Sequence, residues 1–289
     1  MSFLIYTDCT ANLPPKLAEE HDINIIPCTY YVDGKPVFYD GNLDNFDFKA
    51  YYDSLRGGAV VTTTLFNQQT FISTFAPALG EGHDIIYIGM SSGISGTYHS
   101  STLAAAELMG EFPGRVVRTV DSRGCGLGIG LLCCLCDDYR REGMTADEAA
   151  DKLEGDVDCL CEYFTVDDLM FLRRTGRIST PLAAIGTLLG IKPLLWGDES
   201  GHIVECGKFR GRKRVIDAII EKYRTKAKNV ENQRVFISHG DCIDDANEIM
   251  RRILEFSSPR ELYVCPHEPM SGSHVGPGML SLFFLGDSR

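Results

Sequence analysis

The sequence predicts an α/β fold with two domains: a three-layer α/β/α domain with a mainly parallel sheet, then a two-layer α/β domain with a mixed sheet. Strand-like and helix-like segments alternate through the first half of the chain, which is typical of a parallel sheet with helices on both faces. The composition changes near residue 156. Because the chain has 289 residues, 44% of them apolar, we expect two cores, at residues 1–155 and 156–289.

In the first half, short apolar or β-branched runs predict strands at residues 3–6, 23–31, 60–64, 84–89 and 116–120. Asn12 is the expected cap of a helix with Pro14 and Pro15 in its first turn. The capping-box pattern Thr145-Ala146-Asp147-Glu148 opens another helix. Residues 32–47 are rich in Asp, Gly and Asn and are predicted to form a loop. The other helices are expected at residues 48–55, 98–109 and 124–141.

In the second half, strands are predicted at residues 159–166, 203–208, 235–238, 262–264 and 281–285. A short helix is expected at residues 167–172, and longer amphipathic helices at 213–228 and 244–256. The apolar, glycine-punctuated segment 181–195 is a candidate lining for a ligand tunnel, and burial in an ordinary core explains its composition equally well.

Charge and composition exclude several classes of protein. The 28 basic and 40 acidic residues give a net charge of −12, which argues against binding to nucleic acid by bulk electrostatics. The apolar run at residues 124–136 is shorter than the roughly 20 residues that cross a bilayer, and the first residues do not resemble a signal peptide. We therefore expect a cytoplasmic protein without membrane insertion. The 11 cysteines, many of them in apolar runs, are expected to be reduced and buried.

Three predicted strand ends carry hydroxyl side chains and tight turns, within residues 7–10, 62–64 and 91–97. Ligands of open α/β sheets bind at the carboxyl ends of strands. The third segment also opens a helix, whose free N–H groups favour an anion. Any one of these segments could be a simple turn, but together they predict a site for a carboxylate or phosphate.

The segment Gly89-Met90-Ser91-Ser92-Gly93 also matches the G-x-S-x-G pattern of the nucleophile elbow. His239 and His274 lie downstream as candidate bases, and Asp241 as a candidate acid. A serine hydrolase that uses Ser91 is therefore an alternative hypothesis.

Other patterns argue for binding rather than for cofactor chemistry. The sequence contains no Walker A segment, and the alternate glycines at 124, 126, 128 and 130 do not form a dinucleotide fingerprint, so we interpret them as helix-packing positions. The histidines and cysteines lack metal-ligand spacing, so no metal site or cofactor is assigned. Two basic segments, at residues 173–177 and 208–214, predict either a solvated face or a positive rim for an anionic partner.

Taken in order, five segments resemble motifs of the DegV family, the fatty-acid-binding subunits of bacterial fatty acid kinase. They span nearly the whole chain and comprise Thr7-Asp8-Cys9-Thr10 with Leu13-Pro14, Thr62-Thr63-Thr64, Ser91-Ser92-Gly93-Ile94-Ser95-Gly96-Thr97-Tyr98, Asp168-Leu169 through Gly176-Arg177-Ile178-Ser179, and His274-Val275-Gly276-Pro277-Gly278.

The resemblance implies a DegV-like fold that encloses one long-chain fatty acid in a buried tunnel. It implies that the fatty-acid carboxylate is held by Thr62 or Thr63 and by Ser92 or Ser95 with the Gly96 N–H, and that His274 lies beside it. It further implies a rim that faces a separate ATP-binding kinase subunit, formed by Arg174, Arg177 and Arg210. In that arrangement the kinase makes an acyl phosphate, and this chain has no catalytic residue of its own. A lipid-binding sensor without a kinase is a third hypothesis.

Overall fold

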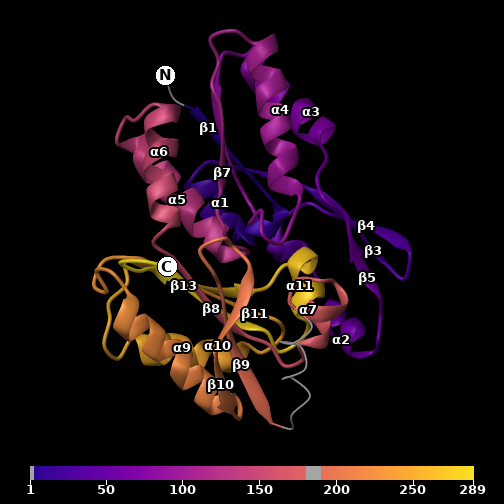
Figure 1. Ribbon diagram of the computed structural model, residues 1–289, viewed down its shortest axis with the longest axis vertical. Helices are drawn as coiled ribbons and strands as arrows, with labels where there is room; N and C mark the ends of the chain where they lie inside the picture. Colours follow the sequence, from indigo (N-terminus) through magenta and orange to yellow (C-terminus); the bar gives the residue numbers. More distant parts are fainter. Residues whose placement is uncertain (1–2, 180–189) are drawn as a thin grey trace.

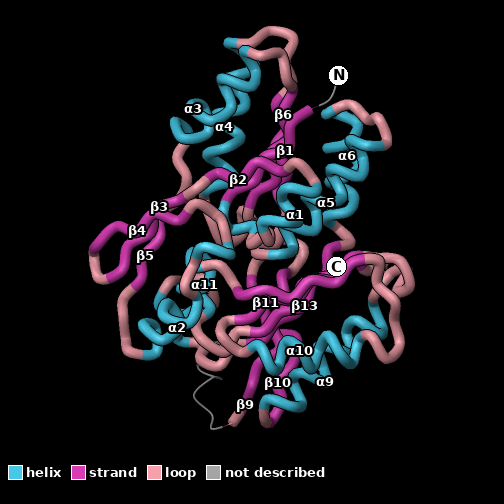
Figure 2. The backbone as a smooth tube through the Cα atoms, turned by 180° about the vertical axis from the view of Figure 1, so that it is seen from behind, coloured by secondary structure: helices cyan, strands magenta, loops and turns pink. Residues whose placement is uncertain are grey.

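The computed structural model describes residues 3–179 and 190–289, which form three β-sheets with helices between and around them (Figure 1). The first sheet is parallel and has the strand order β2-β1-β6-β7. Helices α3 and α4 cover one of its faces, and α1, α5 and α6 cover the other, which confirms the α/β/α arrangement (Figures 1 and 2). Its strands are β1 (Phe3–Asp8), β2 (Ile23–Ile26), β6 (Asp84–Gly89) and β7 (Val117–Asp121). The helices are α1 (Pro15–Glu20), α3 (Gln68–Gly80), α4 (Thr97–Glu111), α5 (Leu127–Arg141) and α6 (Ala146–Val157).

A small antiparallel sheet stands beside the first one, with the order β4-β3-β5 (Figure 2). Its strands are β3 (Cys28–Val32), β4 (Lys35–Tyr39) and β5 (Val61–Thr63), and helix α2 (Phe48–Arg56) connects β4 to β5. The predicted loop at residues 32–47 was wrong where β4 lies, because Asp33 and Gly34 form a tight hairpin turn with positive φ angles of 49° and 78°. Residues 40–47 contain neither a strand nor an α-helix, as predicted. The predicted strand 23–31 is two strands, since Pro27 between them has no N–H for a ladder.

The second large sheet is mixed and has the order β10-β9-β8-β13-β11-β12, in which only β11 and β12 pair in parallel. Helices α9 and α10 pack on one face, and α5 packs on the other. The strands are β8 (Leu160–Thr165), β9 (Ile191–Gly197), β10 (Ile203–Arg210), β11 (Arg234–His239), β12 (Glu261–Pro266) and β13 (Leu280–Leu285). The helices of this half are α7 (Met170–Arg174), α9 (Arg212–Lys226), α10 (Ile243–Ile253) and α11 (Pro269–Val275).

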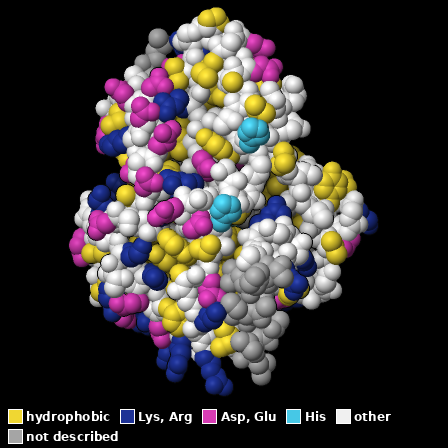
Figure 3. Space-filling view, viewed as in Figure 1, with side chains coloured by type: hydrophobic (Ala, Val, Ile, Leu, Met, Phe, Trp, Pro, Cys, Tyr) yellow, Lys and Arg dark blue, Asp and Glu magenta, His cyan; other side chains and the backbone are white. Residues whose placement is uncertain are grey.

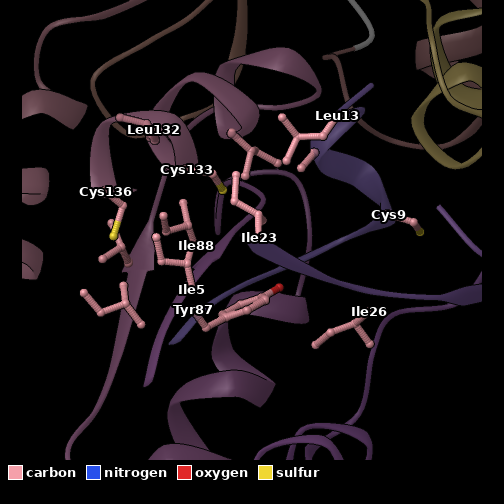
Figure 4. Packing of buried hydrophobic residues seen from close by; sticks show 14 of the residues in the cluster. Ile5, Cys9, Leu13, Ile23, Ile26, Tyr87, Ile88, Leu132, Cys133 and Cys136 are labelled. Atoms are coloured by element: carbon pink, nitrogen blue, oxygen red, sulfur yellow. The ribbon is translucent and has the colours of Figure 1, made fainter. Parts of the chain in front are cut away.

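Helix α5 is the central packing element, because it contacts strands of both large sheets. Its buried side chains join those of the parallel sheet in one apolar core; Ile5 and Ile88 of the strands lie beside Leu132, Cys133 and Cys136 of the helix (Figure 4). The same core takes in side chains from the mixed sheet, such as those of β11 and β13. Division of the chain into two domains at residue 155 stays a prediction, and that residue lies near the end of α6.

Asn12 does not cap α1, which begins at Pro15 without a side-chain cap. Its backbone is left-handed, and its side chain bridges the two halves of the chain instead. The Asn12 amide donates to the carbonyl of Pro266 (3.1 Å), and its oxygen accepts from the N–H of Glu268 (2.7 Å). This contact holds the start of α11, a helix that the sequence analysis did not predict, against the turn that follows β1.

Two further expectations can be compared with the structure. The capping box at Thr145 is present, with reciprocal hydrogen bonds to Glu148. All 11 cysteines are free thiols, but only seven of them are buried: Cys125, Cys159 and Cys242 are half-buried, and Cys206 is exposed. Among residues 3–179 and 190–289, no helix combines the length and the apolar character needed to traverse a bilayer.

Candidate functional site

A cavity of about 400 Å³ lies where the carboxyl ends of the parallel strands meet the mixed sheet and α11. This volume falls within the range of roughly 300–1,000 Å³ that is usual for small-molecule sites. Segments after β1, β6 and β7 contribute to it, as expected for an open parallel sheet, and the segment after β5 of the small antiparallel sheet contributes as well. Apolar side chains make up much of its wall, among them Leu65, Phe66, Ile94, Phe164, Leu172, Ile203, Met270, Val275, Met279 and Phe283.

Polar groups gather at one part of this wall, which we call the exposed end because its residues are partly accessible from outside: Thr63, Ser95, Gly96, Arg177 and His274. Thr63 lies at the end of β5 and His274 in the last turn of α11, and Thr63 Oγ1 and His274 Nε2 are hydrogen-bonded at 3.0 Å. His274 Nδ1 is buried and has no hydrogen-bond partner among the described residues. Burial, with the charges of Arg177 and Arg174, lowers the pKa of His274 to about 4, so its ring is neutral at pH 7.

The beginning of α4 completes the exposed end. Gly96 is the N-cap residue of this 15-residue helix and has no side chain with which to cap it. Ser95 Oγ accepts from the N–H of Thr97 at 3.2 Å, while its hydroxyl donates to Thr97 Oγ1 at 3.1 Å. The positive end of the helix dipole is therefore directed at a cavity that also contains Arg177.

Other residues predicted for this site lie elsewhere. Thr62 and Ser92 are exposed and do not line the cavity; the Ser92 N–H donates to the carboxylate of Asp121. Arg174 also lies outside the lining, and its guanidinium packs over the ring of Phe171 at 4.1 Å. Residues 181–189 of the suspected apolar tunnel segment, 181–195, lie outside the described residues, and much of the remainder forms β9.

Arg210 does not line the cavity either; it is exposed and is the last residue of β10. Figure 3 shows Lys and Arg side chains gathered at the lower end of the molecule, where β10 ends and α9 begins. The exposed basic residues of this region are Lys208, Arg210, Lys213 and Arg214.

The geometry of the G-x-S-x-G segment contradicts the nucleophile elbow. Ser91 is fully buried, and its hydroxyl donates to the carbonyl of Gly201 (2.8 Å) while accepting from the N–H of Gly93 (3.0 Å). Neither candidate base is hydrogen-bonded to Ser91: His274 pairs with Thr63, and His239 Nδ1 accepts from the Cys242 N–H. The hydroxyl of Ser91 therefore joins the β6–α4 turn to the β9–β10 turn and is not activated by a base.

A second group of polar side chains lines another part of the wall, which we call the inner end. Unlike the exposed end, it carries acidic side chains; it comprises Asp8, Cys125, Glu162, His267 and Ser271. The carboxylate of Asp8 accepts from the Thr10 N–H (2.9 Å) and from the hydroxyls of Thr10 and Tyr87 (both 2.5 Å). Burial raises the pKa of Asp8 and raises the pKa of Glu162 to about 7.

Inner-end side chains form a hydrogen-bonded chain with the capping carboxylate of α11. The Ser271 hydroxyl bonds both to His267 Nε2, at 2.8 Å, and to Glu268. His267 Nδ1 is 3.0 Å from the Ser238 hydroxyl, which in turn lies 2.7 Å from Ser281 Oγ. Burial lowers the pKa of His267 to about 3 and raises that of Glu268 to about 7, so the histidine is neutral at pH 7.

The sequence analysis missed the inner end, although one signal was present. Glu162 is the charged residue within an otherwise apolar and aromatic strand, β8. On this strand Leu160 faces the α5 side of the sheet, and strand alternation places Glu162 on the same face. A carboxyl group at such a position needs a buried partner, which is a signal for a polar site.

Together these features define an α/β protein with two large sheets, a small third sheet and an internal, mostly apolar cavity whose exposed and inner ends differ in charge. The family model described as "Uncharacterised protein, DegV family" matches residues 2–287. The chain therefore belongs to the DegV family. It is 35% identical to a DegV domain-containing protein of Clostridium perfringens, over 99% of this chain and 98% of the relative. A similar protein of Streptococcus pyogenes is 31% identical, over 100% of this chain and 99% of the relative.

Solved structures share the whole fold. A DegV family protein from Thermus thermophilus, described with fatty acid binding, superimposes with a TM-score of 0.88 at 26% identity, over 99% of this chain and 100% of that one. DegV from Bacillus subtilis, described as a fatty acid binding protein, superimposes with a TM-score of 0.84 at 28% identity, over 99% of this chain and 100% of that one. The structures similar to this chain thus include fatty-acid-binding proteins.

Proposed function

We propose that this protein binds a single long-chain fatty acid in the cavity, with the carboxylate at the exposed end. The observation that carries the proposal is the lining of the cavity: its wall is mostly apolar, with a neutral and basic group of side chains at the exposed end and an acidic group at the inner end. About 14 methylene groups, buried at roughly 0.8 kcal/mol each, contribute on the order of 10 kcal/mol before association costs. Fatty acid binding by solved relatives supports the same ligand class.

The direction of the fatty acid follows from charge. A carboxylate at the inner end would lie beside Asp8 and Glu162, and repulsion between buried carboxylates is costly. At the exposed end it meets the Arg177 guanidinium and the Thr63 hydroxyl, which donates to it when His274 Nε2 carries the ring proton and donates to Thr63 Oγ1. In this arrangement the His274 ring orients the Thr63 hydroxyl beside the carboxylate. The Gly96 N–H at the start of α4 is a further donor, and the Ser95 hydroxyl becomes one when it turns from Thr97 Oγ1 toward the ligand.

We further propose that the bound acid is presented to a separate, ATP-dependent fatty acid kinase subunit in the cytoplasm. The carboxylate oxygen would attack the γ-phosphorus of ATP, forming the acyl phosphate as the bond to the ADP oxygen breaks. The ligand is itself the nucleophile, so this chain needs no catalytic base and contributes mainly positioning. Arg174, Arg177 and the more distant Arg210 are the proposed rim toward that subunit.

Binding is tested by native mass spectrometry of the purified protein before and after organic extraction, followed by titration with octadecanoic acid. We expect one adduct of fatty-acid mass that extraction removes. Thr63→Val should weaken retention roughly 10- to 100-fold through the loss of a hydrogen bond to a charged group. Thr62→Val is the matched control, because Thr62 is the exposed neighbour of Thr63 and does not line the cavity. Equal retention by both variants would overturn the carboxylate assignment.

The kinase step is tested separately. Loaded protein, ATP and the fatty acid kinase subunit should together yield acyl phosphate, detected as a hydroxamate after trapping with hydroxylamine. Fatty acid binding without acyl phosphate would leave a lipid-binding sensor as the better description.

A further inference from the structure

We propose that the inner end of the cavity recognises a hydroxyl group on the acyl chain, so that the preferred ligand is a hydroxylated fatty acid. This inference rests on the proposed fatty acid binding and specifies its substrate class. The group that would receive the hydroxyl is the carboxyl of Glu162, with the Cys125 thiol beside it.

The protein is built to admit the Glu162 carboxyl at this position. A Cβ atom placed on Gly128 would lie 1.7 Å from Glu162 Oε1, and one placed on Gly124 would lie 2.3 Å from it. A Cβ on Gly126 would lie 2.9 Å from the ring of His267. The alternate glycines before and within α5 therefore leave space for the side chains of Glu162 and His267, and any larger residue at these positions would occupy that space.

One oxygen of this carboxyl is free to bind a ligand. Glu162 is 8% exposed, and its Oε1 accepts from the Cys125 N–H at 3.0 Å. Its Oε2 accepts no hydrogen bond from the residues that the structure describes, and it is not among their fully enclosed, unpartnered atoms. Since Glu162 lines the cavity, the free oxygen is available to a group inside it.

The nearby guanidinium of Arg289 does not donate a hydrogen bond to Glu162 Oε2. The guanidinium of Arg289 donates to four backbone carbonyls, those of Ser122, Arg123, Val157 and Gly197. Its charge still reaches Glu162 through space and opposes the effect of burial on the carboxyl. The remaining hydrogen-bonding capacity of Glu162 is therefore left for a neutral polar group.

A hydroxyl matches this position better than an alkyl chain or a second acid. A plain methylene segment would leave a buried carboxyl oxygen without a partner, which is unfavourable. A second carboxylate would be repelled by Glu162 and Asp8. When Glu162 is ionised, a ligand hydroxyl can donate a hydrogen bond to it. When Glu162 is protonated, the hydroxyl can accept one from it. The Cys125 thiol adds a weak donor.

The test compares octadecanoic acid with a positional series of its monohydroxylated derivatives, each titrated into the full-length protein by native mass spectrometry. We expect at least one isomer to bind about tenfold more tightly than octadecanoic acid, as one hydrogen bond to a charged group predicts. In Glu162→Met this preference should disappear while octadecanoic acid is still retained. Glu162→Gln, which keeps the acceptor for Cys125, should lose at least part of the preference. Glu205→Gln is the matched control, since Glu205 is a half-buried glutamate of the same sheet outside the cavity lining.

The outcomes separate the two proposals. Octadecanoic acid bound as tightly as every hydroxylated isomer would overturn this inference and leave the proposed function standing. A preference that survives unchanged in both Glu162 variants would also overturn it. Failure of all the acids to bind to the wild-type protein would overturn the proposed function and, with it, the inference.

Discussion

Gly128→Ala tests whether the Glu162 carboxyl really lies against the beginning of α5. In an ordinary exposed helix position, Gly→Ala stabilises a protein by about 1 kcal/mol. At Gly128 the new methyl carbon would lie 1.7 Å from Glu162 Oε1 and 2.8 Å from Cδ, so the carboxyl must retreat by well over an ångström. It cannot simply shift toward Gly124, because it is already packed closely against that residue.

The magnitude follows from three contributions. Overpacking costs about 1–3 kcal/mol, and the lost hydrogen bond from Cys125 to a charged acceptor costs about 1.5–3 kcal/mol. The helix-propensity gain offsets about 1 kcal/mol of this. We therefore expect Gly128→Ala to lower the free energy of unfolding by about 1.5–5 kcal/mol, measured by urea denaturation.

Two further variants make the measurement decisive. Gly110→Ala is the control, because Gly110 lies within α4 with open space where its Cβ would be, and it should be neutral or stabilising by up to about 1 kcal/mol. In a Glu162→Ala background, Gly128→Ala should lose most of its cost, because the obstructing carboxyl is gone. If Gly128→Ala is as stable as the wild type, or costs the same in both backgrounds, the described contact is refuted.

Two other predictions concern titration and Ser91. The pKa of Glu162 is raised from 4.5 to about 7, so the folded state keeps a proton that the unfolded chain releases, and stability from this group falls as pH rises from about 4.5 to 7. As pH rises across that window, the free energy of unfolding of Glu162→Gln should therefore increase by up to roughly 3 kcal/mol relative to that of the wild type, measured by urea denaturation. A difference between the two proteins that does not change with pH would contradict the raised pKa. Ser91→Ala should lower the free energy of unfolding by about 1–3 kcal/mol, since the Gly93 N–H loses its acceptor. Wild-type protein should resist labelling by an activated phosphonate, and labelling lost in Ser91→Ala would restore the hydrolase hypothesis.

Most elements were predictable because their signals are local. The strand β6 and the capping box of α6 follow from apolar runs and capping chemistry that need no tertiary context. The β3–β4 hairpin also had a local signal, the Asp33-Gly34 pair between strand-like residues, which was outweighed by the polar composition around it. Helix α11 had a weaker one, because it has only seven residues and is capped by a glutamate, Glu268.

The site was harder to predict because neighbouring residues of similar chemistry point in different directions. Thr62 and Thr63 are adjacent on β5, so their side chains lie on opposite faces, and only pairing with β3 decides which face meets the cavity. Ser92 and Ser95 differ in the same way, since the turn before α4 turns Ser95 inward and leaves Ser92 exposed. Glu162 and the α5 glycines lie far apart in sequence, so their contact depends on the packing of the mixed sheet against α5.

The same contact connects the architecture of the protein to the chemistry of its cavity. Helix α5 packs on both large sheets, and the glycines at its start let a strand of the mixed sheet approach closely enough to bring a carboxyl into the cavity. That carboxyl makes the inner end acidic, while Arg177 at the other end is left to attract the ligand's own carboxylate. The orientation of a bound acid thus depends on repulsion at one end as much as on attraction at the other. Removing the charge of Glu162 should for this reason allow some of the bound acid to lie with its carboxylate at the inner end, even where Thr63 and His274 are intact.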